Sequence, residues 1–177
     1  MDNLINKIYN DKQFINIISD IIKSPKVQEM KNYRQHYGTS CFDHCLMASY
    51  CCYKFCKRHH LDYISCSRAA MVHDLFLYDW RKKQNGRKGS HAFTHPKTAY
   101  KNASSLFDLN QIEKDVILKH MWPITPALPR FKESFVLTAV DKRCAINEAI
   151  FEMHTKYAKK RFFRFAYMFL SLLILKI

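Results

Sequence analysis

The stretch AAMVHDLFLYDW, residues 69–80, places His73 and Asp74 next to each other in an otherwise apolar run. Its Ala, Met, Val and Leu residues predict a helix over about residues 66–77, of the kind that packs into a core. An adjacent imidazole and carboxylate are unexpected in such a helix. The pair therefore directs attention to the other His and Asp residues of the chain.

The composition favours an all-α fold. The 177 residues include 3 Gly and 5 Pro and are rich in Leu, Ile, Ala, Lys, Phe and Tyr. Sandwiches and barrels need many more turn residues. The length suits one substantial core, so we expect residues 1–177 to form a single-domain helical bundle.

Charge indicates the kind of partner. Lys and Arg number 29 against 15 Asp and Glu, a formal net charge of +14. Such a field attracts phosphorylated small molecules, nucleic acid or acidic lipid surfaces. Because lysine is spread along the whole chain and forms no single stripe, we favour a small anionic phosphorylated substrate over nucleic acid.

The seven cysteines bear on the cellular compartment. The N-terminus MDNLINKIYN has polar and acidic residues where a signal peptide needs an apolar core, so a reducing, cytoplasmic location is expected. Cys41, Cys45, Cys52 and Cys56 fall on one helical face and contain no CxxC motif, so we interpret them as small packing residues.

Helical signals also precede the central stretch. Residues 4–23 carry Ile and Leu at spacings of three and four, which predicts an amphipathic helix that ends at Ser24 and Pro25. Ser40 is expected to cap a helix that runs to about residue 60. His44 would then lie in its second turn.

After the central stretch, residues 79–96 form a basic, Gly-containing segment that predicts a long exposed loop. Pro96 suits the first turn of the next helix, with Thr94 as its cap, and a further helix is expected over about residues 110–121. From Lys132 onward there is no Gly or Pro, which predicts one long helix or two with a bend.

The C-terminal segment FFRFAYMFLSLLILKI, residues 162–177, is apolar but contains Arg164. It is too short to cross a bilayer at about 1.5 Å per residue. We interpret a helix over about residues 150–175 as a core or oligomer contact, with a membrane-surface helix as the less favoured alternative. The helices at 4–23 and 150–175 would be additions to a central unit.

The candidate chemistry depends on nitrogen and oxygen donors. Borderline divalent metals accept imidazole and carboxylate, whereas a structural zinc site would normally include cysteine. The candidate ligands on or beside the predicted helices are His44, His73, Asp74, His95, His120 and Asp141. Together they can hold two ions.

The order of these residues resembles the HD superfamily of metal-dependent phosphohydrolases. That family has a helical His, then an adjacent His-Asp pair, then a distal Asp. Here the matching contexts are FDHCLMAS with His44, AAMVHDLF with His73 and Asp74, and LTAVDKRC with Asp141. The resemblance covers about residues 36–148 and implies an HD-type helical bundle.

Some branches of that superfamily add two histidines and hold a binuclear centre. THPKTAYKNA with His95 and ILKHMWPIT with His120 resemble these additions. The resemblance implies that Asp74 bridges two ions, with His44, His73 and Asp141 on one and His95 and His120 on the other. The ions would be divalent Fe, Mn, Co, Ni or Zn. Such branches hydrolyse dinucleoside tetraphosphates or cyclic dinucleotides.

One position departs from the family pattern. Many HD enzymes carry a phosphate-contacting lysine three residues after the aspartate of the pair, where this chain has Leu77. Arg81, Lys82, Lys97 and Lys142 are the candidate replacements, and we favour Lys97 and Lys142 as catalytic partners of Asp74. Side chains expected to contact substrate are those of Arg34, His36, Arg81, His91 and Trp122. Trp80 and Trp122 could instead pack at the core or rim.

Three functions compete. The leading hypothesis is a hydrolase of a phosphoester or phosphoanhydride in a nucleotide-like molecule, because two ions roughly 3.5 to 4 Å apart can polarise a phosphoryl group and activate water. The main alternative is a non-catalytic HD module that binds metal or nucleotide for signalling or scaffolding. A binuclear iron oxygenase is the third, because some HD relatives use the same ligand types.

Overall fold

Helices make up the described part of the chain. The computed structural model describes residues 2–35, 38–82 and 89–157, and no β-strand forms among them. In chain order the helices are α1 (Asp2–Asn10), α2 (Lys12–Ile17), α3 (Ser19–Lys23), α4 (Pro25–Gln28), the 3-10 helix η1 (Glu29–Asn32), α5 (Cys41–Arg58), α6 (Tyr63–Val72), α7 (His91–Ser104), α8 (Gln111–Lys119) and α9 (Lys132–Tyr157). The prediction of an all-α, single-domain fold is confirmed.

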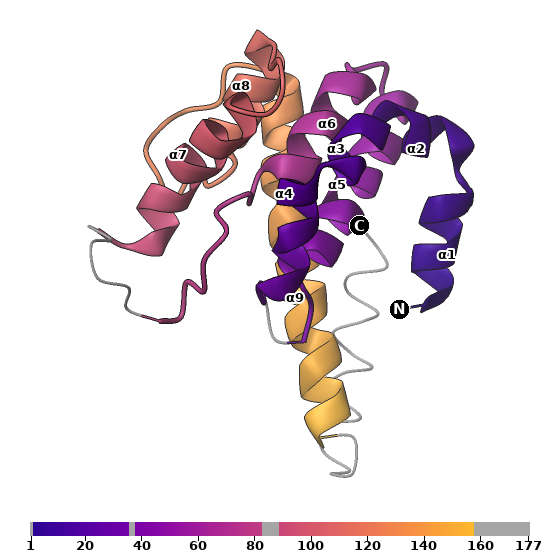
Figure 1. The fold of residues 1–177 in the computed structure, drawn as a ribbon, viewed down its shortest axis with the longest axis vertical. Coiled ribbons are helices and arrows are strands. Elements are labelled where there is room, and N and C mark those ends of the chain that lie inside the picture. The colour runs from indigo at the N-terminus through magenta and orange to yellow at the C-terminus, as the bar shows by residue number, and fades with distance from the viewer. Residues whose placement is uncertain (1, 36–37, 83–88, 158–177) are drawn as a thin grey trace.

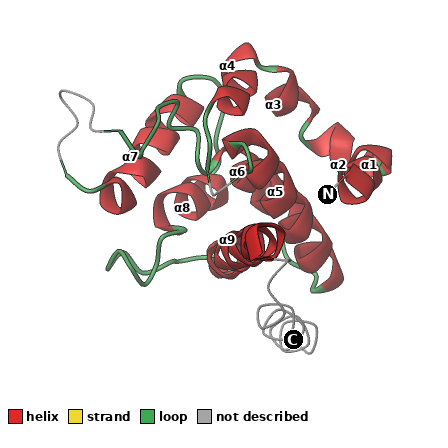
Figure 2. Cartoon of the chain, turned by 90° about the horizontal axis from the view of Figure 1, so that it is seen from below, coloured by secondary structure: helices red, strands yellow, loops and turns green. Residues whose placement is uncertain are grey.

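α5 is central to the arrangement. It packs against α6, α9 and η1, and α8 packs in turn against α6, α7 and α9. Figures 1 and 2 show α7 and α8 on one side of α5 and α6, with α1 and α2 on the other side. α9 begins beside α8, passes α5 and projects beyond the rest of the bundle (Figure 1).

The N-terminal helix expected over residues 4–23 is instead divided into α1, α2 and α3. The first break is at Asp11, whose carboxylate accepts a hydrogen bond from the backbone N–H of Phe14 and so starts a new helix. Phe14 and Ile18 are nevertheless fully buried. The apolar face was therefore predicted correctly, but the continuity of the helix was not.

α5 begins where the sequence predicts. The Ser40 hydroxyl accepts from the backbone N–H of Asp43 at 3.1 Å, the geometry of a helix cap. The face of α5 with Cys41, Cys45, Cys52 and Cys56 is buried in the core, which agrees with their interpretation as packing residues. All seven cysteines are free thiols.

α6 starts and ends earlier than the predicted helix over residues 66–77. Its cap is Asp62, which accepts from the backbone N–H of Ser65 at 2.9 Å, and its last helical residue is Val72. His73 and Asp74 consequently lie in the turn after the helix and not within it. Leu77 then has a φ of 50°, in the left-handed region that ends regular structure.

Side chains from other helices hold the turn that follows α6. The carbonyl of Asp74 accepts from the thiol of Cys41 at 3.3 Å, and that of Leu75 accepts from the amide of Asn102 at 2.7 Å. Backbone carbonyls of this turn are thus satisfied by α5 and α7. Such tertiary partners cannot be read from the local sequence.

α7 starts at His91, five residues before Pro96, so the prediction that Pro96 opens this helix was wrong. Pro96 is inside the helix, and His95 is placed in its second turn. Thr94 does not act as the cap, because its hydroxyl donates to the carbonyl of Ser90 at 3.1 Å. The earlier start turns His91 and His95 toward the same face, one helical turn apart.

α8 and α9 are fixed by polar side chains at their first turns. Asn110 and Glu113 form a capping box at the start of α8. Asp115 accepts from the backbone N–H of Arg130 at 2.8 Å and from the Ser134 hydroxyl at 2.7 Å, which ties the start of α9 to α8. α9 is one helix to Tyr157, and most of the predicted helix over about residues 150–175 lies outside the described residues.

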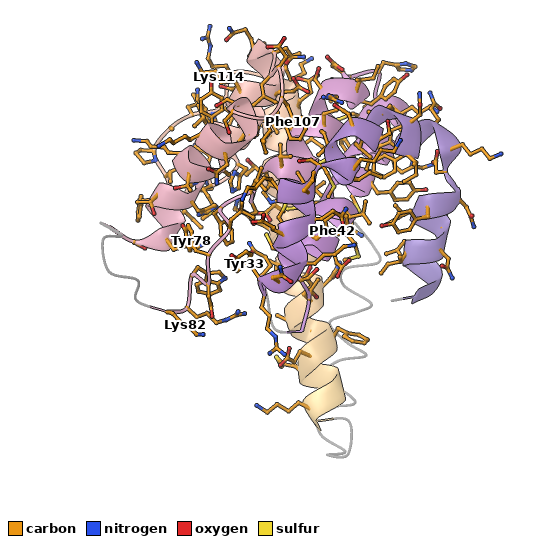
Figure 3. The ribbon with its side chains drawn as sticks, in the orientation of Figure 1. Tyr33, Phe42, Tyr78, Lys82, Phe107 and Lys114 are labelled. Carbon is orange, nitrogen blue, oxygen red and sulfur yellow. The ribbon has the colours of Figure 1, made fainter. Side chains whose placement is uncertain are left out.

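Within the described part of the chain, no helix combines the length and the apolar composition that a membrane span requires. Figure 3 shows side chains filling the space between the helices, with Phe42 and Phe107 among them. Lys82 lies at the outer end of the segment that follows α6, where its side chain is exposed. This segment leads from the His73 and Asp74 turn toward α7.

Candidate metal centre

Six side chains from five parts of the chain meet between α5, α6, α7, α8 and α9. They are those of His44, His73, Asp74, His95, His120 and Asp141, the residues singled out by the resemblance. The four imidazoles and Asp74 are at most 4% exposed, and the side chain of Asp141 is 13% exposed. Polar groups buried to this degree need hydrogen bonds or a metal ion.

The first group contains His44, His73 and Asp141. The Nε2 of His44 lies 3.0 Å from the Oδ1 of Asp141, and the Nε2 of His73 lies 3.5 Å from the same oxygen. The Oδ2 of Asp74 is also 3.5 Å from the His73 Nε2. Asp141 on α9 thus faces His44 on α5 and the turn after α6.

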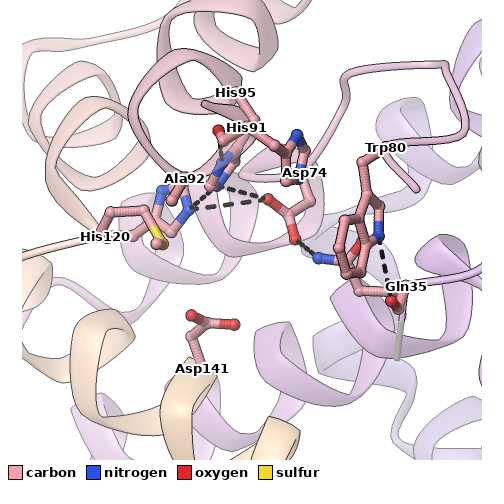
Figure 4. Close-up of a pocket in the computed structure, with 9 residues that line it drawn as sticks. Gln35, Asp74, Trp80, His91, Ala92, His95, His120 and Asp141 are labelled. Carbon is pink, nitrogen blue, oxygen red and sulfur yellow. Dashed lines mark hydrogen bonds and ion pairs between the residues drawn. The ribbon is translucent and has the colours of Figure 1, made fainter. Parts of the chain in front are cut away.

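The second group contains His73, Asp74 and His120, and His95 lies beside it. The Oδ1 of Asp74 lies 3.3 Å from the Nε2 of His95 and 3.7 Å from that of His120. The two Nε2 atoms are 2.8 Å apart. Figure 4 shows the Asp74 carboxylate directed between these imidazoles, with Asp141 facing it across the pocket.

Backbone carbonyls determine which ring nitrogen of three histidines carries a proton. A carbonyl only accepts, so each Nδ1 bound to one must be the N–H donor, and each Nε2 then presents a lone pair in the neutral ring. These contacts are His73 to Ala70 at 2.7 Å, His95 to His91 at 2.8 Å and His120 to Ile117 at 2.8 Å. The three Nε2 atoms are therefore directed at the two aspartates. Burial opposes a charge on His73, but its neighbours, among them Cys45, Asp74 and Asp141, outweigh burial and raise the pKa of His73 well above its usual value, so its Nε2 carries a proton that a metal ion would replace.

His44 differs because both of its ring nitrogens face carboxylates. Its Nε2 faces Asp141 and its Nδ1 lies 3.0 Å from the Oε1 of Glu148. Burial disfavours the charged ring, but these two hydrogen bonds outweigh burial and raise the pKa of His44 well above its usual value. A metal ion on Nε2 would replace the proton that this ring otherwise holds.

Burial and neighbouring charges together set the pKa values of the groups in the centre. Burial opposes ionisation of Asp74, yet the nearby imidazoles, His73 first, outweigh it and lower the pKa of Asp74 to about 2. Burial and the charge of His73 lower the pKa of His120 to about 3. The centre therefore contains ionised carboxylates and at least one neutral imidazole at neutral pH.

These donors fit a divalent metal ion. Two ligand atoms bound to one ion at about 2.1 Å lie about 3.0 to 3.5 Å apart, which is close to the separations within each group. The second nitrogen of a metal-binding histidine usually donates to a carbonyl or carboxylate, and all four imidazoles have such a partner. Two facing lone pairs at 2.8 Å also need a cation or a proton between them.

Two polar residues of the centre were missed by the sequence analysis. Gln35 donates from its amide to the Oδ2 of Asp74, and Glu148 holds His44. Glu148 is seven residues after Asp141, two turns along the same helical face, and this spacing was the available signal. Gln35 lies outside any helix, and no sequence pattern distinguished it from its neighbours.

A cavity of about 120 Å³ lies beside the centre. Besides four of the candidate ligands, it is lined by Gln35, Trp80, His91, Ala92 and Met121. Trp80 and His91 stack with ring planes 10° apart and centroids 5.4 Å apart. The wall opposite the candidate ligands is thus mostly aromatic and apolar (Figure 4).

Of the predicted substrate contacts that the structure describes, His91 lines this cavity. Arg34, Arg81 and Trp122 do not. Arg34 is exposed, and its carbonyl accepts from the guanidinium of Arg81 at 3.3 Å. Trp122 packs edge-on against Phe135, with ring centroids 5.5 Å apart. His36 lies outside the described residues.

The predicted phosphate partners are also away from the cavity lining. The Nζ of Lys142 donates to the carbonyls of His120 and Thr138, each at 3.3 Å. Lys97 is exposed, two residues beyond His95, and therefore points to the other side of α7. Lys82 pairs with Asp79 at 3.7 Å, and the partly buried Leu77 packs against the core.

No match to this chain is found by comparison with protein-family models, curated proteins or solved structures. The chemistry of the centre is therefore inferred from its own residues and their contacts. Those residues define a helical protein with buried His and Asp groups that can hold a metal ion.

Proposed function

We propose that this chain is a metal-dependent phosphohydrolase of the HD superfamily, with its HD core over about residues 36–148. The observation that carries the proposal is the meeting of His44, the His73 and Asp74 pair, and Asp141. These residues lie on three separate segments, in the chain order that the HD pattern requires. Packing alone gives no reason for such an order to end in one buried centre.

The proposal includes two ions that share Asp74. Its Oδ2 faces His73, and its Oδ1 faces His95 and His120, so the two oxygens are directed to different groups. One position would use His44, His73 and Asp141, and the other His95 and His120. The candidate ions are divalent Fe, Mn, Co, Ni and Zn, which all accept imidazole and carboxylate.

The side chains of the centre would position the reacting groups. Divalent ions bound there supply Lewis-acid activation of a phosphoryl group and of an attacking water. Asp74 would be oriented by the amide of Gln35, and the anchored Nδ1 atoms would fix the imidazole rings. No Ser or Cys nucleophile is required.

The shape of the cavity supports a small phosphorylated substrate. A volume of about 120 Å³ admits a phosphoryl group and little more, well below the roughly 300 Å³ of pockets that enclose a whole ligand. The remainder of a nucleotide-like molecule would lie beyond Trp80 and His91. The net charge of +14 would draw such an anion toward the protein.

Metal analysis combined with a panel of phosphate esters and anhydrides tests the proposal. We expect bound divalent metal, release of phosphate or a nucleotide product, and loss of both in an Asp74→Ala variant. Oxygen uptake in place of hydrolysis would indicate the oxygenase. Metal binding without turnover of any substrate would support the non-catalytic module.

A further inference from the structure

The partner of His44 distinguishes it from the other histidines of the centre. His73, His95 and His120 each donate from Nδ1 to a backbone carbonyl, whereas the Nδ1 of His44 faces the Oε1 of Glu148 at 3.0 Å. Glu148 is 5% exposed. A negatively charged acceptor makes an imidazole a stronger metal ligand than a neutral carbonyl does.

The two sides of the centre therefore differ in negative charge. The position of His44, His73 and Asp141 has the Asp141 carboxylate, a share of Asp74 and Glu148 behind His44. The position of His95 and His120 has a share of Asp74, and its imidazoles are anchored on carbonyls. An ion of charge +2 is held more strongly by the more negative position.

The burial of Glu148 also favours stronger ion binding at the position of His44, His73 and Asp141. Its Oε2 has no hydrogen-bond partner among the described residues, so the carboxylate is incompletely satisfied. A buried carboxylate with an unsatisfied oxygen is costly unless a nearby cation offsets its charge. In the metal-free protein the protonated ring of His44 lies beside Glu148, and a divalent ion on the far side of His44 would supply the positive charge in place of that proton.

We propose that Glu148 is a positioning residue that makes the two ion positions unequal. The position of His44, His73 and Asp141 binds its ion more tightly, and the position of His95 and His120 fills second and exchanges. The inference rests on the two-ion centre of the proposed function. It assigns to Glu148 a role that neither the HD pattern nor the cavity lining contains.

Titration of the full-length, metal-stripped protein with Mn²⁺ in a calorimeter tests this inference. We expect a tight and a weak phase in the wild type. Glu148→Gln keeps an oxygen that can accept from His44 and removes the charge, so it should weaken the tight phase about tenfold and leave the weak phase nearly unchanged. His120→Gln should do the reverse and weaken the second phase.

Glu133→Gln provides a matched control. Glu133 is also a buried acid of α9, but it accepts from the backbone N–H of Asp62 at 3.0 Å and does not contact His44. Its variant should retain both phases. Two equal sites in the wild type, or a tight phase unchanged by Glu148→Gln, would overturn the inference and leave the proposed function standing. Absence of Mn²⁺ binding would overturn both.

Discussion

At the scale of single residues, Asp74 is the point where the two groups of the centre meet. Its two oxygens face different imidazoles, and one of them also accepts from Gln35. The neighbouring imidazoles keep this carboxyl ionised in spite of its burial. Changes at Asp74, Gln35 or His120 should therefore alter the centre directly.

Gln35→Leu should destabilise the metal-free protein, because Asp74 would lose its amide donor while remaining buried. The expected loss in the free energy of unfolding is about 2 kcal/mol, typical of an unsatisfied buried group. Urea unfolding in the presence of a chelator measures it. Arg34→Ala, at the exposed neighbouring side chain, is the control and should have little effect. Equal losses in the two variants would contradict the assigned contact.

The lowered pKa of His120 predicts a pH dependence of stability in the metal-free protein. Between the unfolded pKa near 6.5 and the folded pKa of about 3, the unfolded chain binds a proton at His120 that the folded protein does not. Stability should therefore fall as the pH falls through this window, by on the order of 2 kcal/mol at His120 between about pH 7 and about pH 4.5.

Urea unfolding at both pH values measures this effect. His120→Gln should reduce the difference, and His59→Gln, at an exposed position, is the control. A pH dependence that is the same in wild type and His120→Gln would show that His120 is not held neutral by its surroundings.

At the scale of helices, the ends of the elements determine where the ligands lie. Ser40 starts α5 one turn before His44, and α6 ends one residue before His73. His120 follows the last residue of α8 in the same way. Three of the candidate ligands are therefore held near helix ends, where side chains from neighbouring helices complete the hydrogen bonding.

Ser40→Ala should lower the free energy of unfolding by about 1 kcal/mol, because the backbone N–H of Asp43 would lose its acceptor. Thermal or urea unfolding measures the loss. Ser90→Ala is a matched control, because Ser90 precedes α7 without a side-chain cap hydrogen bond. The cap assignment would be wrong if the two variants lost the same stability.

The helices and the candidate ligands could be predicted from the sequence to different degrees. Apolar spacing, Ser40 and the scarcity of Gly and Pro were sufficient for the fold class and for the start of α5. The turn that carries His73 and Asp74 could not be predicted, because it is held by hydrogen bonds from Cys41 and Asn102, which are distant in the chain.

Some side chains of the site could also be predicted from the sequence, and others could not. His44, the pair and Asp141 could be found because their order forms a pattern. Gln35 has no such pattern, and Lys142 looked available to substrate although its ammonium group contacts carbonyls of the protein. Contacts of this kind depend on tertiary packing.

At the scale of the whole molecule, the centre joins helices that are far apart in the sequence. The candidate ligands come from α5, α7 and α9 and from the turns after α6 and α8. An ion bound there contacts the folded protein but not the unfolded chain. It should therefore stabilise the bundle as a unit.

Removal of metal should lower the melting temperature. A ligand present at a hundred times its dissociation constant stabilises the folded state by about 2.7 kcal/mol. Calorimetry of the protein with Mn²⁺ and with excess chelator measures the difference. Asp74→Ala should show a much smaller response to the chelator, and an equal response would place the stabilising ion elsewhere.

The most direct test of the account is anomalous X-ray diffraction from crystals of the Mn²⁺-loaded protein. We predict an anomalous peak bonded to the Nε2 atoms of His44 and His73 and to Asp141, with Asp74 beside it, at ligand distances of about 2.0 to 2.3 Å. A peak bonded only to other residues, or no peak among these side chains, would contradict a metal centre at this place in the fold.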